Sequence, residues 1–300
     1  MFIFKLSSWL DKFDPYWYSR FLGLKISYIA IILFFANALL QPPIAPSFIM
    51  IIAISGILLI ESPTINSFNK KDNVYFIYTF LVLLTIAIFS LNVYLQTWFI
   101  LVAFAWCYIL YNLLKKAPAM FPVVSLILML GVMSLEGPYT PANTYIVLNQ
   151  ILYFSEFSII VFWAHKCFPN LYLRVWKSIL LRCLENYQFA LNSGNEFNHE
   201  LATKHYMALR NVLPLLTANN EIYALAKYSS RINEFNYFIA NFCQDINSES
   251  RLRVSLIEDL HELYQGILKN KPVELMMVDL PKNSKLIELV QKWNKICAKN

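Results

Sequence analysis

The sequence predicts an all-α, polytopic membrane protein, with six transmembrane helices in three hairpins followed by a helical bundle. Hydrophobic residues make up 58% of its 300 residues and charged residues 15%, with a mean hydropathy of +0.47, whereas soluble domains carry about 25% charged residues. Residues 1–169 contain 9 Lys and Arg and 6 Asp and Glu, against 16 and 13 in residues 170–300. Apolar segments of about 20 residues, the length that a helix needs to cross a bilayer, recur in the first part.

Composition divides the chain into three predicted regions. In residues 1–20, Phe2, Leu6, Trp9 and Phe13 recur at helical spacing with lysines between them, a pattern typical of an N-terminal interfacial helix on a membrane surface. A frayed terminus is the alternative. No cleavable signal sequence is expected, since this segment lacks an apolar run and a small-residue cleavage site. Residues 21–169 are the predicted six-helix transmembrane domain, and residues 170–300 the predicted cytoplasmic all-helical domain.

Turn-forming residues separate the six predicted spans. Proline occurs in four of the five breaks, and proline both lacks a backbone donor and biases the preceding residue away from helix. The remaining break is Asn92-Val93. The spans are expected over residues 21–40, 43–60, 74–91, 94–114, 119–135 and 144–164.

The positions of Lys and Arg predict the orientation of the spans. Positively charged flanks are retained in the cytoplasm, and the three loops that alternate with the basic ones contain no Lys or Arg. Both termini are therefore predicted to be cytoplasmic. The basic flanks contain Lys5, Lys12, Arg20, Lys70, Lys71, Lys115, Lys116, Lys166, Arg174 and Lys177.

The second part of the chain shows the apolar spacing of amphipathic helices, each with one stripe to bury. A helix over about 171–192 is expected to follow the sixth span directly, and Pro214 is expected to end or kink the second helix of a four- or five-helix bundle. Three stripes are predicted to be buried: Leu225, Tyr228, Ile232, Phe235, Ile239 and Phe242; Leu252, Leu256, Leu260, Leu263 and Ile267; and Leu286, Leu289, Val290, Trp293 and Ile296.

Two ionisable residues lie within the predicted spans, where a charge is costly and usually faces a cavity or a partner. Glu156 lies in the sixth span, and Lys25 lies about one turn into the first span, in the same leaflet. A Lys25–Glu156 pair is geometrically possible. In the functional interpretation Glu156 is a proton-coupling carboxylate or a gate. In the structural interpretation Lys25 reaches the headgroups and Glu156 is a hydrogen-bonded or protonated acid.

Amides and one histidine complete the candidate pathway. Asn149 and Gln150 lie about two turns before Glu156, Asn37 lies near the end of the first span, and His165 lies at the predicted cytoplasmic mouth. Because Asn149 and Glu156 are seven residues apart, they share a helix face that could line a polar path. The alternative for the amides is interhelical hydrogen bonding, and a lone histidine is more often an interface residue.

Several function classes are not indicated. Net charge is +6 without a basic block, so nucleic acid is not an expected partner. The five cysteines are far apart, and the two Glu-x-x-His spacings, Glu196 to His199 and Glu258 to His261, are weak metal signals. No nucleotide-binding or hydrolase motif occurs, and six glycines leave little for a phosphate loop. We expect no enzymatic activity, no cofactor and no metal.

Two segments stand out beside the predicted architecture of six spans and a helical domain. They are the apolar, proline-bearing first hairpin, Leu39-Leu40-Gln41-Pro42-Pro43-Ile44-Ala45-Pro46, and the exit from the sixth span, Phe162-Trp163-Ala164-His165-Lys166-Cys167-Phe168-Pro169. In these features the chain resembles one repeat of the fusaric acid resistance, or aromatic acid exporter, family. The sequence departs from the family's R-x-x-G-T-x-x-G pattern at residues 69–76, which contain neither Arg nor Gly. No family residue is carried over at that segment.

The resemblance implies a bacterial inner-membrane permease that exports aromatic or related organic anions, with a periplasmic membrane-fusion protein as its partner. Because members usually contain two such halves, a single half implies a homodimer or higher homo-oligomer. A consistent mechanism is anion capture at Lys25 and His165, passage past Asn149 and Gln150, and proton entry through Glu156. The alternative is a non-transporting membrane scaffold whose helical domain recruits a protein partner.

Overall fold

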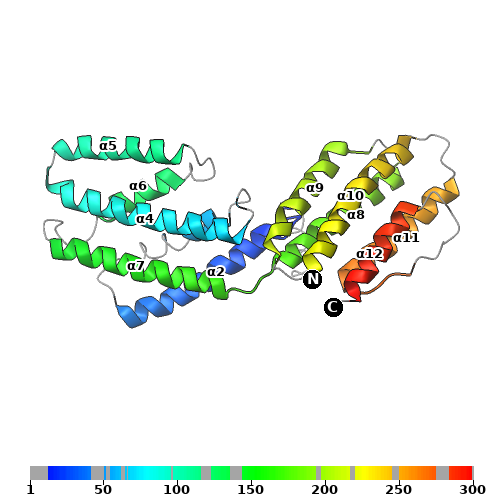
Figure 1. Ribbon diagram of the computed structural model, residues 1–300, viewed down its shortest axis with the longest axis horizontal. Coiled ribbons are helices and arrows are strands. Elements are labelled where there is room, and N and C mark those ends of the chain that lie inside the picture. The colour runs from blue at the N-terminus through cyan, green and yellow to red at the C-terminus, as the bar shows by residue number, and fades with distance from the viewer. Residues whose placement is uncertain are drawn as a thin grey trace. The chain divides into compact units, whose positions relative to one another are not determined.

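The computed structural model describes residues 13–41, 51, 55–61, 65, 67–95, 97–115, 123–135, 144–193, 197–216, 220–244, 250–274 and 284–298. Over these residues the fold is all-helical, with no strand (Figure 1). The chain divides into two compact units. We call residues 22–169 the apolar unit, and residues 13–21 together with 170–298 the bundle unit.

Among the described residues, four helices are long and apolar enough to cross a membrane, which indicates that the chain associates with one. They are α2 (Tyr18–Leu40), α4 (Phe68–Asn92), α5 (Thr97–Leu114) and the segment Val147–Cys167 of α7 (Thr144–Cys167). These helices correspond to the first, third, fourth and sixth predicted spans.

The two other predicted spans are described in part. The second is helical at residue 51 and over residues 55–60, and its other residues lie outside the described ranges. The fifth contains α6 (Val123–Met133), an apolar helix of 11 residues. At 1.5 Å per residue this helix is about 16 Å long, shorter than a bilayer core.

Helix α4 is the centre of the apolar unit and packs against α5, α6 and α7. Its buried face repeats every three or four residues through Tyr78, Val82, Ile86 and Phe89, as expected of one side of a helix. At Gly131 of α6, an added Cβ would lie 2.6 Å from the Thr85 methyl carbon. The absence of a side chain there therefore permits the close approach of α6 to α4.

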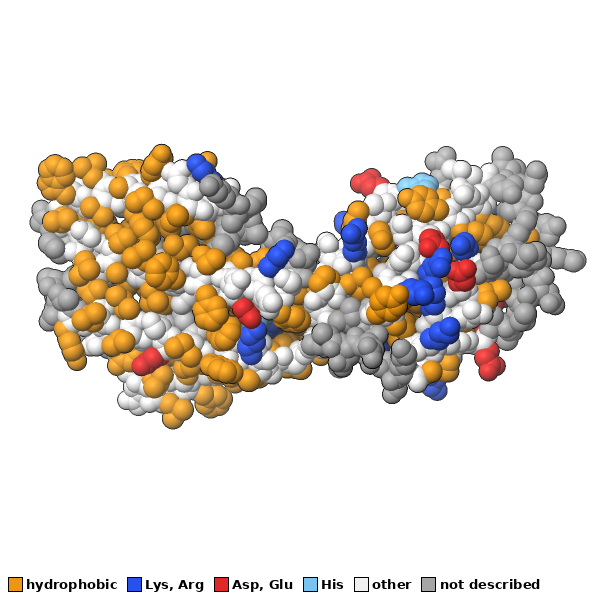
Figure 2. Space-filling view, viewed as in Figure 1, with side chains coloured by type: hydrophobic (Ala, Val, Ile, Leu, Met, Phe, Trp, Pro, Cys, Tyr) orange, Lys and Arg blue, Asp and Glu red, His pale blue; other side chains and the backbone are white. Residues whose placement is uncertain are grey.

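A second core cluster joins α2, the helix over residues 55–60 and α7. Ile29 and Leu33 of α2 pack in one cluster with Ile57 and with Val161 of α7. The outer faces of these helices carry large exposed apolar side chains. Figure 2 shows hydrophobic side chains over most of the visible face of the apolar unit, whereas charged side chains are spread over the bundle unit.

In the described part of the chain after residue 170, the structure contains five α-helices and a 3-10 turn. They are α8 (Tyr172–Ser193), α9 (His199–Val212), η3 (Leu213–Leu215), α10 (Asn220–Gln244), α11 (Ser250–Lys269) and α12 (Ser284–Cys297). The three predicted apolar stripes are buried on α10, α11 and α12, except that Phe242 is half-buried. As predicted, α9 ends just before Pro214, which lies in η3 because its ring cannot continue the helix.

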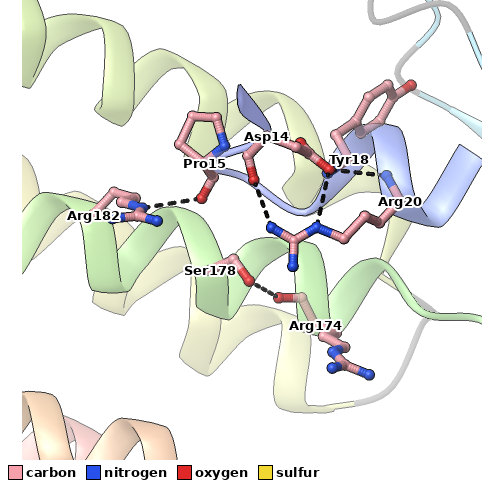
Figure 3. A network of polar contacts seen from close by, with 7 residues as sticks. All are labelled: Asp14, Pro15, Tyr18, Arg20, Arg174, Ser178 and Arg182. Carbon is pink, nitrogen blue, oxygen red and sulfur yellow. Dashed lines mark hydrogen bonds and ion pairs between the residues drawn. The ribbon is translucent and has the colours of Figure 1, made fainter. Parts of the chain in front are cut away.

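Residues 13–21 group with the bundle unit and begin α2 (Figure 3). The Asp14 carboxylate accepts hydrogen bonds from the backbone N–H groups of Tyr18 at 2.9 Å and Arg20 at 2.8 Å. It thereby satisfies donors that a helix start leaves without an internal partner. Arg182 of α8 donates to the Pro15 carbonyl at 3.2 Å. The other apolar residues of the predicted interfacial helix, Phe2, Leu6 and Trp9, lie outside the described residues.

Candidate functional site

A cluster of buried charges lies inside the apolar unit. The Lys25 ammonium donates to Oε1 of Glu61 at 2.5 Å, and the Lys71 ammonium donates to Oε2 of the same carboxylate at 2.7 Å. All three side chains are at most 4% exposed. We call Lys25, Glu61 and Lys71 the charge cluster.

The topology of the unit brings these residues together. Lys25 lies in the second turn of α2, Glu61 lies in the turn that directly follows the helix over residues 55–60, and Lys71 lies in the first turn of α4. Antiparallel neighbours place the start of one helix beside the end of the previous one. The charge cluster therefore lies at the end of the unit that contains the predicted cytoplasmic loops.

The position of Lys71 depends on where α4 begins. The sequence predicts a span from residue 74, with Lys70 and Lys71 in the preceding loop, but α4 begins at Phe68. Ser67 caps this extended start because its side chain accepts a hydrogen bond from the Lys70 N–H. Lys71 consequently joins the buried face of α4, one turn before Tyr75 and two before Tyr78.

His165 of α7 adjoins the charge cluster. Its side chain is 6% exposed, and its Nδ1 atom has no hydrogen-bond partner among the described residues. The charges of Lys25, Glu61 and Lys71 all act on its imidazole ring. A buried ring nitrogen beside two ammonium groups can accept a hydrogen bond from an entering molecule.

An aromatic ring and a second ion pair border this site. The Lys25 ammonium lies 5.6 Å from the centroid of Phe168, within the range of a cation–π interaction. Lys166 donates to Asp72 at 2.6 Å, and both of those side chains are partly exposed. The site thus combines two buried cations, one buried acid and an aromatic surface.

Keeping three charges away from water has an energetic cost. The desolvation of each ion is of the order of several kcal/mol, and mutual attraction offsets it only with close hydrogen-bonded geometry. The bidentate arrangement of Glu61 between two ammonium groups supplies such geometry. The charge cluster itself therefore contains two positive charges and one negative charge.

The structure brings together only two of the residues selected from the sequence, Lys25 and His165. Glu156 is exposed on α7, on the side opposite the buried Phe154 and Val161. The possible Lys25–Glu156 pair does not form, because Glu61 is the carboxylate bonded to Lys25. The helix over residues 55–60 ends directly before Glu61, and this places the Glu61 carboxylate beside Lys25.

The three candidate amides lie far from the charge cluster along their helices. Asn37 is twelve residues beyond Lys25, or about 18 Å along α2. Asn149 and Gln150 are near the start of α7, and His165 is near its end. All three amides are half-buried, and Gln150 donates to the Ser134 carbonyl at 3.4 Å, which is the interhelical role that the sequence left as the alternative.

The weak metal signals fall on solvent-facing positions. His199, Glu258 and His261 are exposed, and Glu196 lies outside the described residues. Within the described ranges, no three His, Cys, Asp or Glu side chains are grouped as metal ligands.

Glu61 and Lys71 are the two members of the site that the sequence interpretation missed. Lys71 could have been found by extending the α4 spacing backwards, since residues 71, 75, 78 and 82 repeat every three or four positions. Glu61 directly follows an apolar segment and was assigned to a loop. A hydropathy average assigns a charged residue at the end of an apolar segment, such as Glu61, to the loop, because the average contains no information on where the side chain points.

Comparisons of the whole chain with known proteins gave no match to a family model, to a curated protein or to a solved structure.

Proposed function

We propose that this protein is a membrane transporter that exports organic anions, and that the charge cluster binds the anion's carboxylate. The observation that carries the proposal is the buried carboxylate of Glu61 held between Lys25 and Lys71. An entering carboxylate has the same chemistry as Glu61 and can replace it on either ammonium group. Phe168 offers an apolar surface for an aromatic ring beside Lys25.

The same geometry supports coupling to protons. If a substrate carboxylate replaced Glu61 on the two lysines, the Glu61 carboxylate would lose its counter-ions in a low-dielectric environment. Such an environment favours the protonated form of an acid. Substrate binding and proton uptake are thereby linked through Glu61, which takes the coupling role that the sequence interpretation gave to Glu156.

The wider architecture is part of this proposal. We propose six spans with both termini in the cytoplasm of a bacterial inner membrane, so that the charge cluster faces the cytoplasm and captures anions there. The resemblance to the aromatic acid exporter family supports this arrangement, a homo-oligomer and a periplasmic membrane-fusion protein as partner. In this arrangement Asn37, Asn149 and Gln150 lie toward the periplasmic end of the path.

Efflux from proteoliposomes tests the proposal. Vesicles containing the purified full chain are loaded with benzoate or 4-hydroxybenzoate, and initial efflux is measured with an imposed pH gradient. We expect Lys25→Met to lower the rate at least tenfold, because about 1.4 kcal/mol of lost binding already corresponds to tenfold. Lys115→Met is the matched control, since Lys115 is exposed and bonded to Asn112 rather than to the cluster.

Two further variants separate a folding defect from a transport defect. Lys25→Arg keeps the charge and is expected to retain part of the efflux, whereas Glu61→Gln is expected to make the rate insensitive to the pH gradient. Each variant is first checked for monodispersity and for its unfolding midpoint. Absence of efflux of either probe by the folded wild-type chain would contradict the proposal and favour a scaffold whose bundle unit recruits a partner.

A further inference from the structure

The exposed face of α7 repeats every seven residues. Its side chains form two rows, and members of one row are seven residues apart. Taken together in sequence order, the members of both rows are alternately four and three residues apart, which is the spacing of the contact positions in a pair of supercoiled helices. Each of its four apolar members is more than half exposed, Glu156 is exposed and Asn149 is half-buried. We call this set the α7 seam: Tyr145, Leu152 and Ile159 in one row, and Asn149, Glu156 and Trp163 in the other.

The α7 seam is separate from the contacts that α7 makes within the apolar unit. Val147, Phe154, Phe157 and Val161 are buried, at most 2% exposed, and lie on the other side of the helix. At 100° per residue, Phe154 lies about 160° around the helix from Glu156. The seam is therefore a second packing surface, which the other described elements leave uncovered.

Glu156 distinguishes the α7 seam from the other outer faces of the apolar unit. The exposed faces of α2 and α5 carry large apolar side chains, including Phe34 and Phe35 on α2 and Phe104 on α5. Among the described residues, Glu156 is the only charged side chain exposed in the middle of an apolar helix. Acyl chains offer a carboxyl group no hydrogen bond, and an ionisable residue at this depth usually faces a partner.

We propose that α7 packs against α7 of a second copy of this chain, in a parallel pair with the two Glu156 carboxyl groups in contact. A two-fold axis along the membrane normal keeps every residue at its own depth, so each seam residue meets its counterpart. Glu156 then meets an identical carboxyl, and two carboxyl groups that share one proton form a hydrogen bond. Asn149 meets its counterpart two turns away and fixes the register, as polar residues at such positions do.

The interface does not depend on the proposed transport, and cross-linking tests it directly. In a full-length chain whose five cysteines are replaced by serine, Leu152→Cys and Ile159→Cys are oxidised separately in native membranes. Both are expected to give a disulfide-linked dimer of the chain, because facing positions across such a pair come within disulfide range. Phe104→Cys, on the exposed face of α5, is the matched control and is expected to remain monomeric.

Substitution of Glu156 tests the role of the carboxyl groups. The fraction of dimer is measured by single-molecule photobleaching at decreasing ratios of protein to lipid. Glu156→Leu is expected to weaken dimerisation about three- to tenfold, the usual range for a hydrogen bond between membrane helices. Glu156→Gln retains hydrogen bonding and is expected to stay within twofold of the wild type.

Three outcomes would overturn the proposal. They are equal cross-linking of Phe104→Cys and the seam variants, cross-linking of the seam to a different membrane protein, and a dimer that Glu156→Leu leaves unchanged. Because transport is not measured in either experiment, failure here is distinguishable from failure of the proposed transport.

Discussion

The two units of this protein use helices of similar length but distribute charge in opposite ways. In the bundle unit, α10, α11 and α12 bury apolar stripes, and their described charged side chains are exposed or half-buried, except for the buried Asp259. In the apolar unit, large apolar side chains are exposed on α2 and α5, while Lys25, Glu61 and Lys71 are buried. The difference follows from the solvent, because a lipid-facing surface gains nothing from charge and the bundle surface gains hydration.

This comparison shows that burial has different meanings in the two units. In the bundle unit a buried side chain is removed from water, so apolar contacts stabilise the fold. In the apolar unit the hydrophobic effect does not drive one helix against another, so close packing and hydrogen bonds hold the helices together. Polar substitutions are therefore expected to have their largest effects inside the apolar unit, and apolar truncations inside the bundle unit.

The largest expected effect comes from Glu61→Gln. The substitution leaves two buried ammonium groups without their shared carboxylate, and breaking a buried ion pair costs about 3–5 kcal/mol. Asp72→Asn is the matched control, because it breaks the partly exposed pair with Lys166, which is worth about 0–1 kcal/mol. Equilibrium unfolding in mixed micelles measures both, and equal losses would contradict the contrast between buried and exposed charge.

Replacing the whole cluster sharpens the same contrast. Buried ionic triads exchanged for apolar residues of similar volume are often neutral or stabilising by about 1–4 kcal/mol. The triple variant Lys25→Met, Glu61→Leu and Lys71→Met is therefore expected to have an unfolding midpoint at least as high as that of the wild type. It is also expected to lose anion efflux. A triple variant that is much less stable would show that the cluster serves mainly to hold the fold.

Leu260→Ala is the corresponding test of the bundle unit. Leu260 is fully buried on α11, and truncation of such a residue costs about 2–5 kcal/mol. Leu101→Ala, at an exposed position on α5, is the control and is expected to change stability by less than about 1 kcal/mol. Labelling of the buried Cys183 thiol during unfolding reports the bundle unit specifically. Unchanged labelling in Leu260→Ala would refute the importance of apolar burial there.

A smaller effect is expected from Gly131→Ala, which probes close packing in the apolar unit. The new methyl group would lie within 3.0 Å of atoms of Thr85 and Phe89, so α6 must shift, at a cost of about 1–3 kcal/mol. Gly23→Ala in α2 is the control, because no atom lies within 4 Å of its added Cβ. The control is expected to be neutral or stabilising by up to about 1 kcal/mol. Similar unfolding midpoints for both variants would exclude a tight contact between α4 and α6.

The smallest effect is a pH dependence in the bundle unit. Burial lowers the pKa of His205 below its ordinary 6.5, and the charges of Lys204 and Arg182 lower it further, against the opposite effect of Glu185. Since folding lowers the pKa of His205, the neutral His205 side chain contributes to the stability of the fold above about pH 6.5. This contribution is lost as the pH falls through the pKa that His205 has in the folded state. Tyr16 is hydrogen-bonded to Nδ1 of the same ring at 2.7 Å.

His205→Gln is expected to flatten the change in unfolding midpoint between pH 7.5 and pH 5. His199→Gln, at an exposed position, is expected to leave the wild-type slope unchanged. If the unfolding midpoint of His205→Gln changed with pH as much as that of the wild type, the pH dependence would come from other groups.

Much of the fold could be predicted from periodicity and composition. The start of α7, the buried stripes of the bundle unit and the end of α9 before Pro214 follow from local patterns that bear directly on helix geometry. The four long apolar helices follow from hydropathy, because the length of a span is fixed by the bilayer.

The candidate site was less predictable, because its contacts join segments that are distant in sequence. Lys25 and Glu61 are 36 residues apart, and no local pattern pairs them. Hydropathy windows also assign charges at the edge of an apolar run to loops, which is why Glu61 and Lys71 were missed and Glu156 was favoured. Which acid meets Lys25 is determined by where two helices end and begin: the helix over residues 55–60 ends just before Glu61, and Ser67 caps the start of α4.

The shared carboxylate of Glu61 also has a consequence for the order of assembly. During synthesis Lys25 is made 36 residues before Glu61, and Lys71 follows Glu61 by 10. The nascent chain therefore carries Lys25 in its first apolar helix before Glu61, which neutralises it, has been synthesised. We therefore expect the first apolar helix to remain close to water, or to the insertion machinery, until the second apolar helix and the beginning of α4 have emerged. The three consecutive segments are then expected to enter the lipid together.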